Sequence, residues 1–306
     1  MPRIPDTPAA GMALMACGVS IAPVMDVCAK ILTDTMSPGS VAFWRFIAQL
    51  CVLAPLFLLP RRWVWPGRYH VLGGLSLAVA LVSIAAALRV MPVANVIAIF
   101  FVEPLILTLM SAYLLGEGLG WRRLTAVGIG LAGAMIVIRP SWEAFGVASL
   151  YPLITAFAFA SYLLCNRVMR GQSDRIVLQF WLGAFALGAL SVAIAFGEAV
   201  GVGFLAFDVP GEAELPYIVL MGLIAAGGHQ LVMQGVARAE AAALAPIQYL
   251  EIIAAVLLGW AVFGDLPDLW TWVGTGVIVA AGLFVFIRER RLPPTRRAHP
   301  PAPTPR

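Results

Sequence analysis

Two glutamates lie in the middle of long apolar segments, where a charged side chain is costly. Glu103 is followed directly by Pro104, and Glu251 lies 148 residues further along, in a second apolar segment. An ionisable residue within a membrane-spanning segment usually faces the interior of a helix bundle or a water-filled path. A carboxyl group removed from water in this way can exchange protons close to neutral pH. The pair indicates either a substrate or ion pathway, or two buried carboxyls that only hydrogen-bond neighbouring helices.

Further polar residues accompany these glutamates along the chain. Gln248 and Tyr249 fall within one helical turn of Glu251. Asn95 precedes Glu103 by one to two turns, and Pro104 predicts a kink beside that glutamate. The Tyr249 ring can stack on a flat substrate while its hydroxyl group donates a hydrogen bond. We therefore predict that these side chains share one pathway.

A second group of polar residues offers charges of both signs. Asp26 and Lys30 are four residues apart and share one helix face, so they form either a neutralised ion pair or an outer mouth where one of them binds substrate. Arg45 either snorkels to the interface or is a fixed cation for a carboxylate or phosphate, because its planar fork favours bidentate binding. Trp44 beside it belongs either to an interfacial aromatic belt or to the recognition site.

His229 and Gln230 lie near the middle of a later apolar segment. The histidine is either a hydrogen-bonded helix contact or a proton-relay or substrate contact. The chain has no H-E-x-x-H, no G-x-S-x-G and no Asp-rich metal motif, and its glycine-rich stretches follow no strand. We therefore expect no catalytic residues, no cofactor, no metal site and no nucleic-acid partner.

The elements that position these residues follow from composition. The 306 residues are 61% apolar and only 12% charged, with a mean hydropathy of +0.92, whereas a soluble domain carries about 25% charged residues. This excludes a soluble enzyme, a disordered chain and a fibrous protein. Ten apolar runs approach the length of a membrane span: Gly11–Leu32, Gly39–Leu59, His70–Leu88, Val93–Leu115, Leu124–Ile138, Gly146–Cys165, Ile176–Phe196, Leu215–Gln234, Ala241–Phe263 and Thr271–Ile287. The predicted fold is an all-α integral membrane protein with ten transmembrane helices.

The arginines predict the orientation of this bundle. If the N-terminus is cytoplasmic, 16 arginines fall in cytoplasmic segments and only Arg89 and Arg139 fall outside. Basic residues are enriched on the cytoplasmic side of membrane proteins, so we expect both termini there. Residues 289–306, rich in proline and arginine, are predicted to form a disordered cytoplasmic tail.

The two halves of the chain resemble each other. An offset of 148 residues places Glu103 on Glu251, Gly116 on Gly264 and Glu117 on Asp265. Five spans per half is an odd number, so the second half must be inverted relative to the first. Inverted repeats place a substrate site near the midplane and permit alternating access. The predicted units are residues 1–144 and 145–288, and the last span of each half is rich in glycines that favour close packing: Gly128, Gly130, Gly133, Gly274 and Gly276.

Three stretches carry a resemblance to a known family. Residues 104–137, PLILTLMSAYLLGEGLGWRRLTAVGIGLAGAMIV, resemble the end of an EamA repeat, and residues 245–285, APIQYLEIIAAVLLGWAVFGDLPDLWTWVGTGVIVAAGLFV, resemble the same unit in the second half. Phe-Trp-Arg-Phe at 43–46 is similar to the start of the family's second helix. The chain thus resembles the drug/metabolite transporter superfamily, with two EamA repeats. The second turn departs from the family's Gly-Glu, since it reads Gly264-Asp265.

The resemblance implies a central cavity between helices one, three, four, six, eight and nine. It also implies a small-molecule substrate of an amino-acid, nucleoside or S-adenosylmethionine type, moved across the bacterial inner membrane with proton coupling or by exchange. A lipid flippase, an integral-membrane enzyme and a non-transporting receptor are the alternatives. Substrate, direction, coupling ion and the choice between monomer and homodimer are left open.

Overall fold

The computed structural model describes residues 7–58, 65–115, 121–169, 172, 174–238, 244 and 247–289. All regular structure in these residues is helical, and they contain no strand. The predicted tail lies almost wholly outside them, as do Gly116 and Glu117 of the repeat alignment. The helices are α1 (Pro8–Leu32), α2 (Pro38–Phe57), α3 (Arg68–Leu88), α4 (Val93–Phe100), α5 (Glu103–Leu115), α6 (Trp121–Phe145), α7 (Tyr151–Val168), α8 (Arg175–Val200), α9 (Leu215–Arg238), α11 (Leu250–Phe263) and α12 (Leu269–Glu289), with short 3-10 turns at Gly146–Leu150 and Gly203–Leu205.

Seven segments are long and apolar enough to cross a membrane, and three apolar helices are shorter. The shorter helical segments are Leu124–Ile138, Leu250–Phe263 and Leu269–Phe284. The expectation of an all-helical membrane protein is thereby confirmed, while the count of ten spans stays a prediction.

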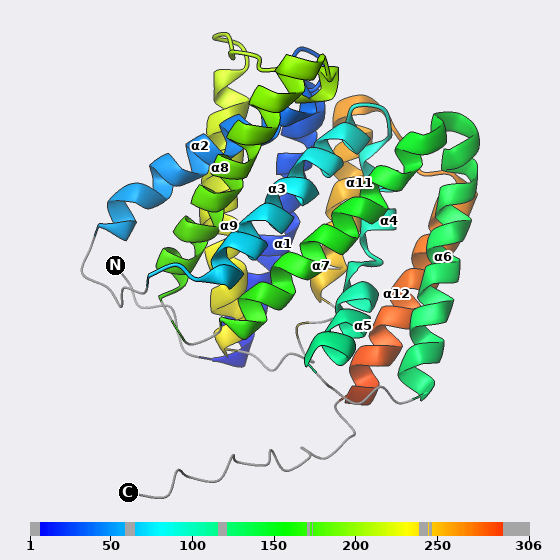
Figure 1. The fold of residues 1–306 in the computed structure, drawn as a ribbon. Coiled ribbons are helices and arrows are strands. Elements are labelled where there is room, and N and C mark those ends of the chain that lie inside the picture. The colour runs from blue at the N-terminus through cyan, green and yellow to red at the C-terminus, as the bar shows by residue number, and fades with distance from the viewer. Residues whose placement is uncertain are drawn as a thin grey trace, which may run out of the picture.

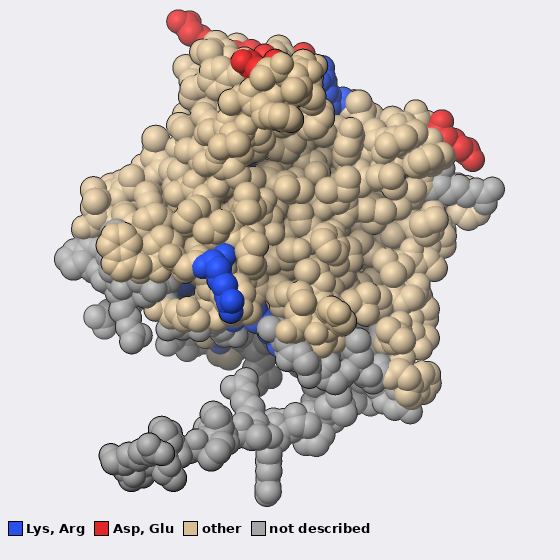
Figure 2. Space-filling view, in the orientation of Figure 1, with Lys and Arg blue, Asp and Glu red and all other residues tan. Residues whose placement is uncertain are grey.

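The outer surface fits lipid rather than water. On the face shown in Figure 2 the broad middle carries almost no charged side chains, and acidic side chains lie toward one end. Large side chains such as Met135, Val192 and Phe196 are exposed on α6 and α8. Monomeric soluble proteins rarely expose apolar surface this extensively, whereas a bilayer accommodates it.

The fourth predicted span is broken at its glutamate. Helix α4 ends at Phe100 and α5 begins at Glu103, with a turn over Phe101 and Val102. Pro104 has no N–H to donate to the carbonyl of Phe100, so the regular ladder cannot continue through this point. The predicted kink is confirmed, and it places Glu103 in the first turn of a new helix.

The helices pack across the two halves of the chain. Helix α1 packs along α9, α3 packs along α7 and α8, and α2 packs against both α8 and α9. Helices α6 and α12 form a separate pair at one edge of the bundle (Figure 1). This arrangement leaves α1, α2, α3, α7, α8 and α9 around a common interior.

The glycine prediction is only partly right. A Cβ atom added at Gly274 would lie 2.7 Å from the carbonyl oxygen of Gly133, so these two glycines allow α6 and α12 to approach closely. Gly130 faces Leu105 and Ala281 at short range. The prediction is wrong for the two remaining glycines, Gly128 and Gly276, because a Cβ there meets no described atom within 4 Å.

Candidate functional site

A cavity of about 470 Å³ lies in the interior of the bundle. Lining residues come from α1, α3, α4, α5, α7, α9 and α11. These helices correspond to predicted helices one, three, four (which is broken into α4 and α5), six, eight and nine, the set that the resemblance implies. Helices α2 and α8 also contribute to the wall. Small-molecule sites typically have volumes of about 300–1,000 Å³. The cavity is therefore large enough for a metabolite.

Three carboxyl groups from three helices line this cavity: Asp26 of α1, Glu103 of α5 and Glu251 of α11. Glu103 is buried, and its Oε1 atom has no hydrogen-bond partner. Glu103 and Glu251 each lie in the first turn of their helix. The two residues that the repeat places in register thus reach one space from the two halves of the chain.

Arg45 supplies a positive charge to the same cavity. It is buried, with 9% of its surface exposed, and its Nη1 atom has no hydrogen-bond partner. Gln49, one turn further along α2, also lines the cavity and has an unpartnered Oε1 atom. Buried polar atoms in native proteins nearly always have partners. Arg45 and Gln49 thus bring a guanidinium and an amide group to one cavity wall, and each side chain keeps a buried polar atom without a partner.

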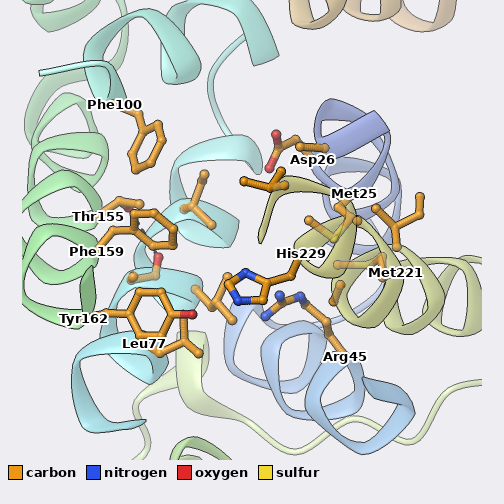
Figure 3. Close-up of a pocket in the computed structure, with 18 of the residues that line it drawn as sticks. Met25, Asp26, Arg45, Leu77, Phe100, Thr155, Phe159, Tyr162, Met221 and His229 are labelled. Carbon is orange, nitrogen blue, oxygen red and sulfur yellow. Dashed lines mark hydrogen bonds between the residues drawn. The ribbon is translucent and has the colours of Figure 1, made fainter. Parts of the chain in front are cut away.

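His229 and Gln248 complete the predicted residues that line the cavity. In Figure 3 the His229 ring lies beside the Arg45 guanidinium and points toward Tyr162 across the open space. Helix α9, which carries His229, packs against both α1 and α2. The histidine therefore shares the cavity with the guanidinium of α2.

Two predicted residues are held near the ends of helices instead. Lys30 forms an ion pair with Asp265, with 2.7 Å between Nζ and Oδ2, so its partner is not Asp26. The Trp44 indole donates a hydrogen bond of 2.9 Å to the carbonyl oxygen of Asp208, in the loop after α8. Neither side chain lines the cavity.

The three remaining predicted residues lie behind the cavity wall or in the core. Gln230 donates to Gln179, with 2.8 Å from Nε2 to Oε1. The Tyr249 ring packs 5.5 Å from the ring of Phe101, and Asn95 is buried in α4. None of these three lines the cavity, although Gln230 holds Gln179, which does.

Sequence reasoning missed one aromatic wall and three polar groups. Phe159 of α7 lies 5.5 Å from Phe100 of α4 and 5.2 Å from Tyr162, measured between ring centroids. Tyr162, Thr155, Gln49 and Gln179 also line the cavity. Gln49 carried a usable signal, because it follows Arg45 by four residues on one helix face. The α7 residues had none, because aromatic and hydroxyl side chains are common in membrane helices.

The described residues contain no cluster of three or more metal-ligating side chains. The cavity wall combines charges, amides and aromatic rings, which suits binding of a polar aromatic solute. A solute-binding cavity within an apolar helical bundle is the architecture of a membrane carrier.

Comparisons with known proteins agree with this class. The sequence model of the EamA-like transporter family matches residues 9–139 and again residues 146–287. The chain belongs to the EamA-like transporter family, within the drug/metabolite transporter superfamily.

Named relatives include carriers of two kinds. A riboflavin transporter of Rhizobium johnstonii is 30% identical over 83% of this chain and 82% of its own length. An S-adenosylmethionine uptake transporter of Rickettsia prowazekii is 24% identical over 88% of this chain and 89% of its own. A crystal structure covers 92% of this chain and 98% of its own with a TM-score of 0.61 at 18% identity, which shows the shared fold.

Proposed function

We propose that this protein is a secondary transporter that carries a small metabolite across the bacterial inner membrane through the central cavity. The observation that carries the proposal is the cavity itself, a space of about 470 Å³ that is lined by the polar residues Arg45, Gln49 and Glu103. Polar and charged side chains are costly inside an apolar bundle unless they have a partner, and a bound polar solute would be such a partner. The substrate is of an amino-acid, nucleoside or S-adenosylmethionine type.

Alternating access would follow from two inverted five-helix repeats. If α1 corresponds to α7 and α3 to α9, the contact of α1 with α9 maps onto that of α7 with α3. Both contacts are present. By the same correspondence the contact of α2 with α9 maps onto that of α8 with α3, and this pair is present as well. This reciprocity supports ten helices in two repeats that rock about the cavity, with both termini in the cytoplasm.

Glu103 and Glu251 would set the polarity of the pathway and exchange protons or hold a cationic group. A proton-coupled carrier accumulates substrate in response to an imposed pH gradient. An exchanger requires a second solute on the opposite side. Both modes use the same cavity, and the position of the carboxyls supports either.

The test is uptake of labelled riboflavin and S-adenosylmethionine, with an amino-acid and nucleoside panel, into liposomes that contain the purified protein. We expect saturable uptake of at least one class, and a loss of at least tenfold in Glu251→Gln. The matched control is Glu143→Gln, because Glu143 is exposed on α6 and outside the cavity. Correctly folded protein that moves no solute would contradict the proposal, and equal uptake by Glu251→Gln would remove the cavity from the pathway.

A further inference from the structure

Arg45 is a buried cation that forms no direct ion pair with any described residue. Its Nη1 atom has no hydrogen-bond partner. An unpaired ion inside a protein is strongly destabilising. A guanidinium binds a carboxylate with two parallel hydrogen bonds better than any other side chain does. The Arg45 side chain, which lines the cavity, therefore suits an anionic group of a ligand.

The remaining charge on the cavity wall is of the opposite sign. Asp26, Glu103 and Glu251 contribute three carboxyls from α1, α5 and α11. The Oε1 atom of Glu103 is buried and unpartnered. These carboxyls offer acceptors to a cationic group that Arg45 would repel.

Asp26 and Arg45 reach the cavity from two different helices. These helices are α1 and α2, and α9 packs against both of them. Figure 3 shows the Asp26 carboxyl apart from the Arg45 guanidinium, which lies beside the His229 ring of α9. A ligand with separated positive and negative groups can therefore contact both side chains.

An aromatic wall faces these charges. Phe159 and Tyr162 lie on α7, and the Tyr162 hydroxyl points toward the space occupied by His229 and Arg45 (Figure 3). Phe100 extends this wall from α4. Rings at these positions suit a flat ring system of the solute.

We infer that the substrate is a zwitterion that carries an aromatic or heteroaromatic ring, with its anionic group on Arg45 and its cationic group on the acids Asp26, Glu103 and Glu251. The inference rests on the proposed transport function and narrows its substrate class. An uncharged flat solute would fill the aromatic wall but leave the guanidinium and the carboxyls unpaired. A site built to hydrogen-bond a polar group discriminates strongly against analogues that lack it.

The test measures two dissociation constants on one preparation of the protein, one for a compound with a carboxylate and one for its analogue without it. The quantity compared between variants is the ratio of these two dissociation constants. The probes are S-adenosylmethionine and its decarboxylated analogue, tryptophan and tryptamine, and riboflavin as the uncharged solute. For the better zwitterion we expect the analogue without the carboxylate to bind at least tenfold more weakly, which corresponds to about 1.4 kcal/mol. In Arg45→Gln the ratio should fall to about one, and Arg45→Lys should give an intermediate value because it keeps the charge without the fork.

The ratio of dissociation constants distinguishes a loss of carboxylate recognition from a loss of folded protein. Unfolded protein lowers the binding capacity for both probes but leaves the ratio of dissociation constants unchanged. Arg89→Gln is the matched control, because Arg89 is exposed at the end of α3 and outside the cavity, and it should keep the wild-type ratio.

Three results would overturn the inference. Arg45→Gln could weaken both members of a probe pair equally. Riboflavin could be bound and transported while neither zwitterion is, which would leave the transport function standing and remove only the charge assignment. Absence of uptake for every probe would contradict the transport function itself, and the inference with it.

Discussion

Glu103 and Glu251 occupy corresponding positions in the two halves but differ in burial. Glu103 is 3% exposed and has an unpartnered oxygen, whereas Glu251 is partly exposed. A buried polar atom without a partner costs about 1–3 kcal/mol. Glu103 therefore lowers the stability of the structure, as expected of a side chain that serves binding rather than folding.

The first prediction concerns that cost. Glu103→Gln keeps the shape of the side chain and removes the possibility of a buried charge, so the melting temperature should stay within about 2 °C of wild type or rise. Uptake should nevertheless fall at least tenfold. Thermal unfolding in detergent and liposome uptake measure the two effects, with Glu143→Gln as the exposed control. A large drop in melting temperature with normal uptake in the folded fraction would show that Glu103 is structural.

At this scale the sequence predicts the charged lining better than the rest of the cavity. Asp26, Arg45, Glu103 and Glu251 all line it, because an ionisable residue in an apolar helix usually faces the bundle interior. Lys30, near the end of α1, pairs with Asp265 instead. Trp44 and Tyr249 do not, because an aromatic side chain fits a core or a loop contact as readily as a binding site. Partners far apart in the chain, such as Trp44 with Asp208, depend on loop geometry that no local pattern encodes.

Among the elements, α6 and α12 show how small residues set helix distance. Gly133 and Gly274 face each other so closely that a Cβ atom at Gly274 would contact the backbone of α6. Gly276, one half-turn along α12, faces no described atom within 4 Å. The sequence identifies both glycines as packing candidates, and only the rotation of α12 about its axis distinguishes them.

The element-scale prediction uses this pair. Gly274→Ala should destabilise the protein by about 1–3 kcal/mol through overpacking against backbone that cannot move aside. Gly276→Ala should be neutral or stabilise by up to about 1 kcal/mol, because alanine favours the helix more than glycine does. Thermal unfolding of both variants in the same detergent is the measurement. Equal effects of the two substitutions would contradict the close contact between α6 and α12.

Interruptions within helices and contacts at helix ends also differ in how well the sequence predicts them. The Glu103-Pro104 pair correctly predicts the interruption between α4 and α5, since proline acts through a local, covalent constraint. The contacts of the loop after α8 could not be predicted in this way. There Asp208 accepts a hydrogen bond from the Ser37 N–H at 2.6 Å and donates its own N–H to Ser40 at 2.7 Å.

At the scale of the whole molecule, polar contacts between the two halves gather at one end of the bundle. The Asp208 loop holds the start of α2, and Lys30 near the end of α1 pairs with Asp265 after α11. If the arginine distribution sets the orientation, this end faces away from the cytoplasm. The proposed carrier must open these contacts once in each transport cycle.

The central claim is that one cavity becomes accessible from each side of the membrane in turn. Met25 lines the cavity (Figure 3), so a single cysteine in its place reports access after the four native cysteines are replaced. The measurement is the rate of labelling by a membrane-impermeant thiol reagent, applied from either side of vesicles of known orientation. We predict labelling from both sides, slowed by a transported solute. Labelling from one side only, unchanged by any solute that the protein moves, would contradict alternating access through this cavity.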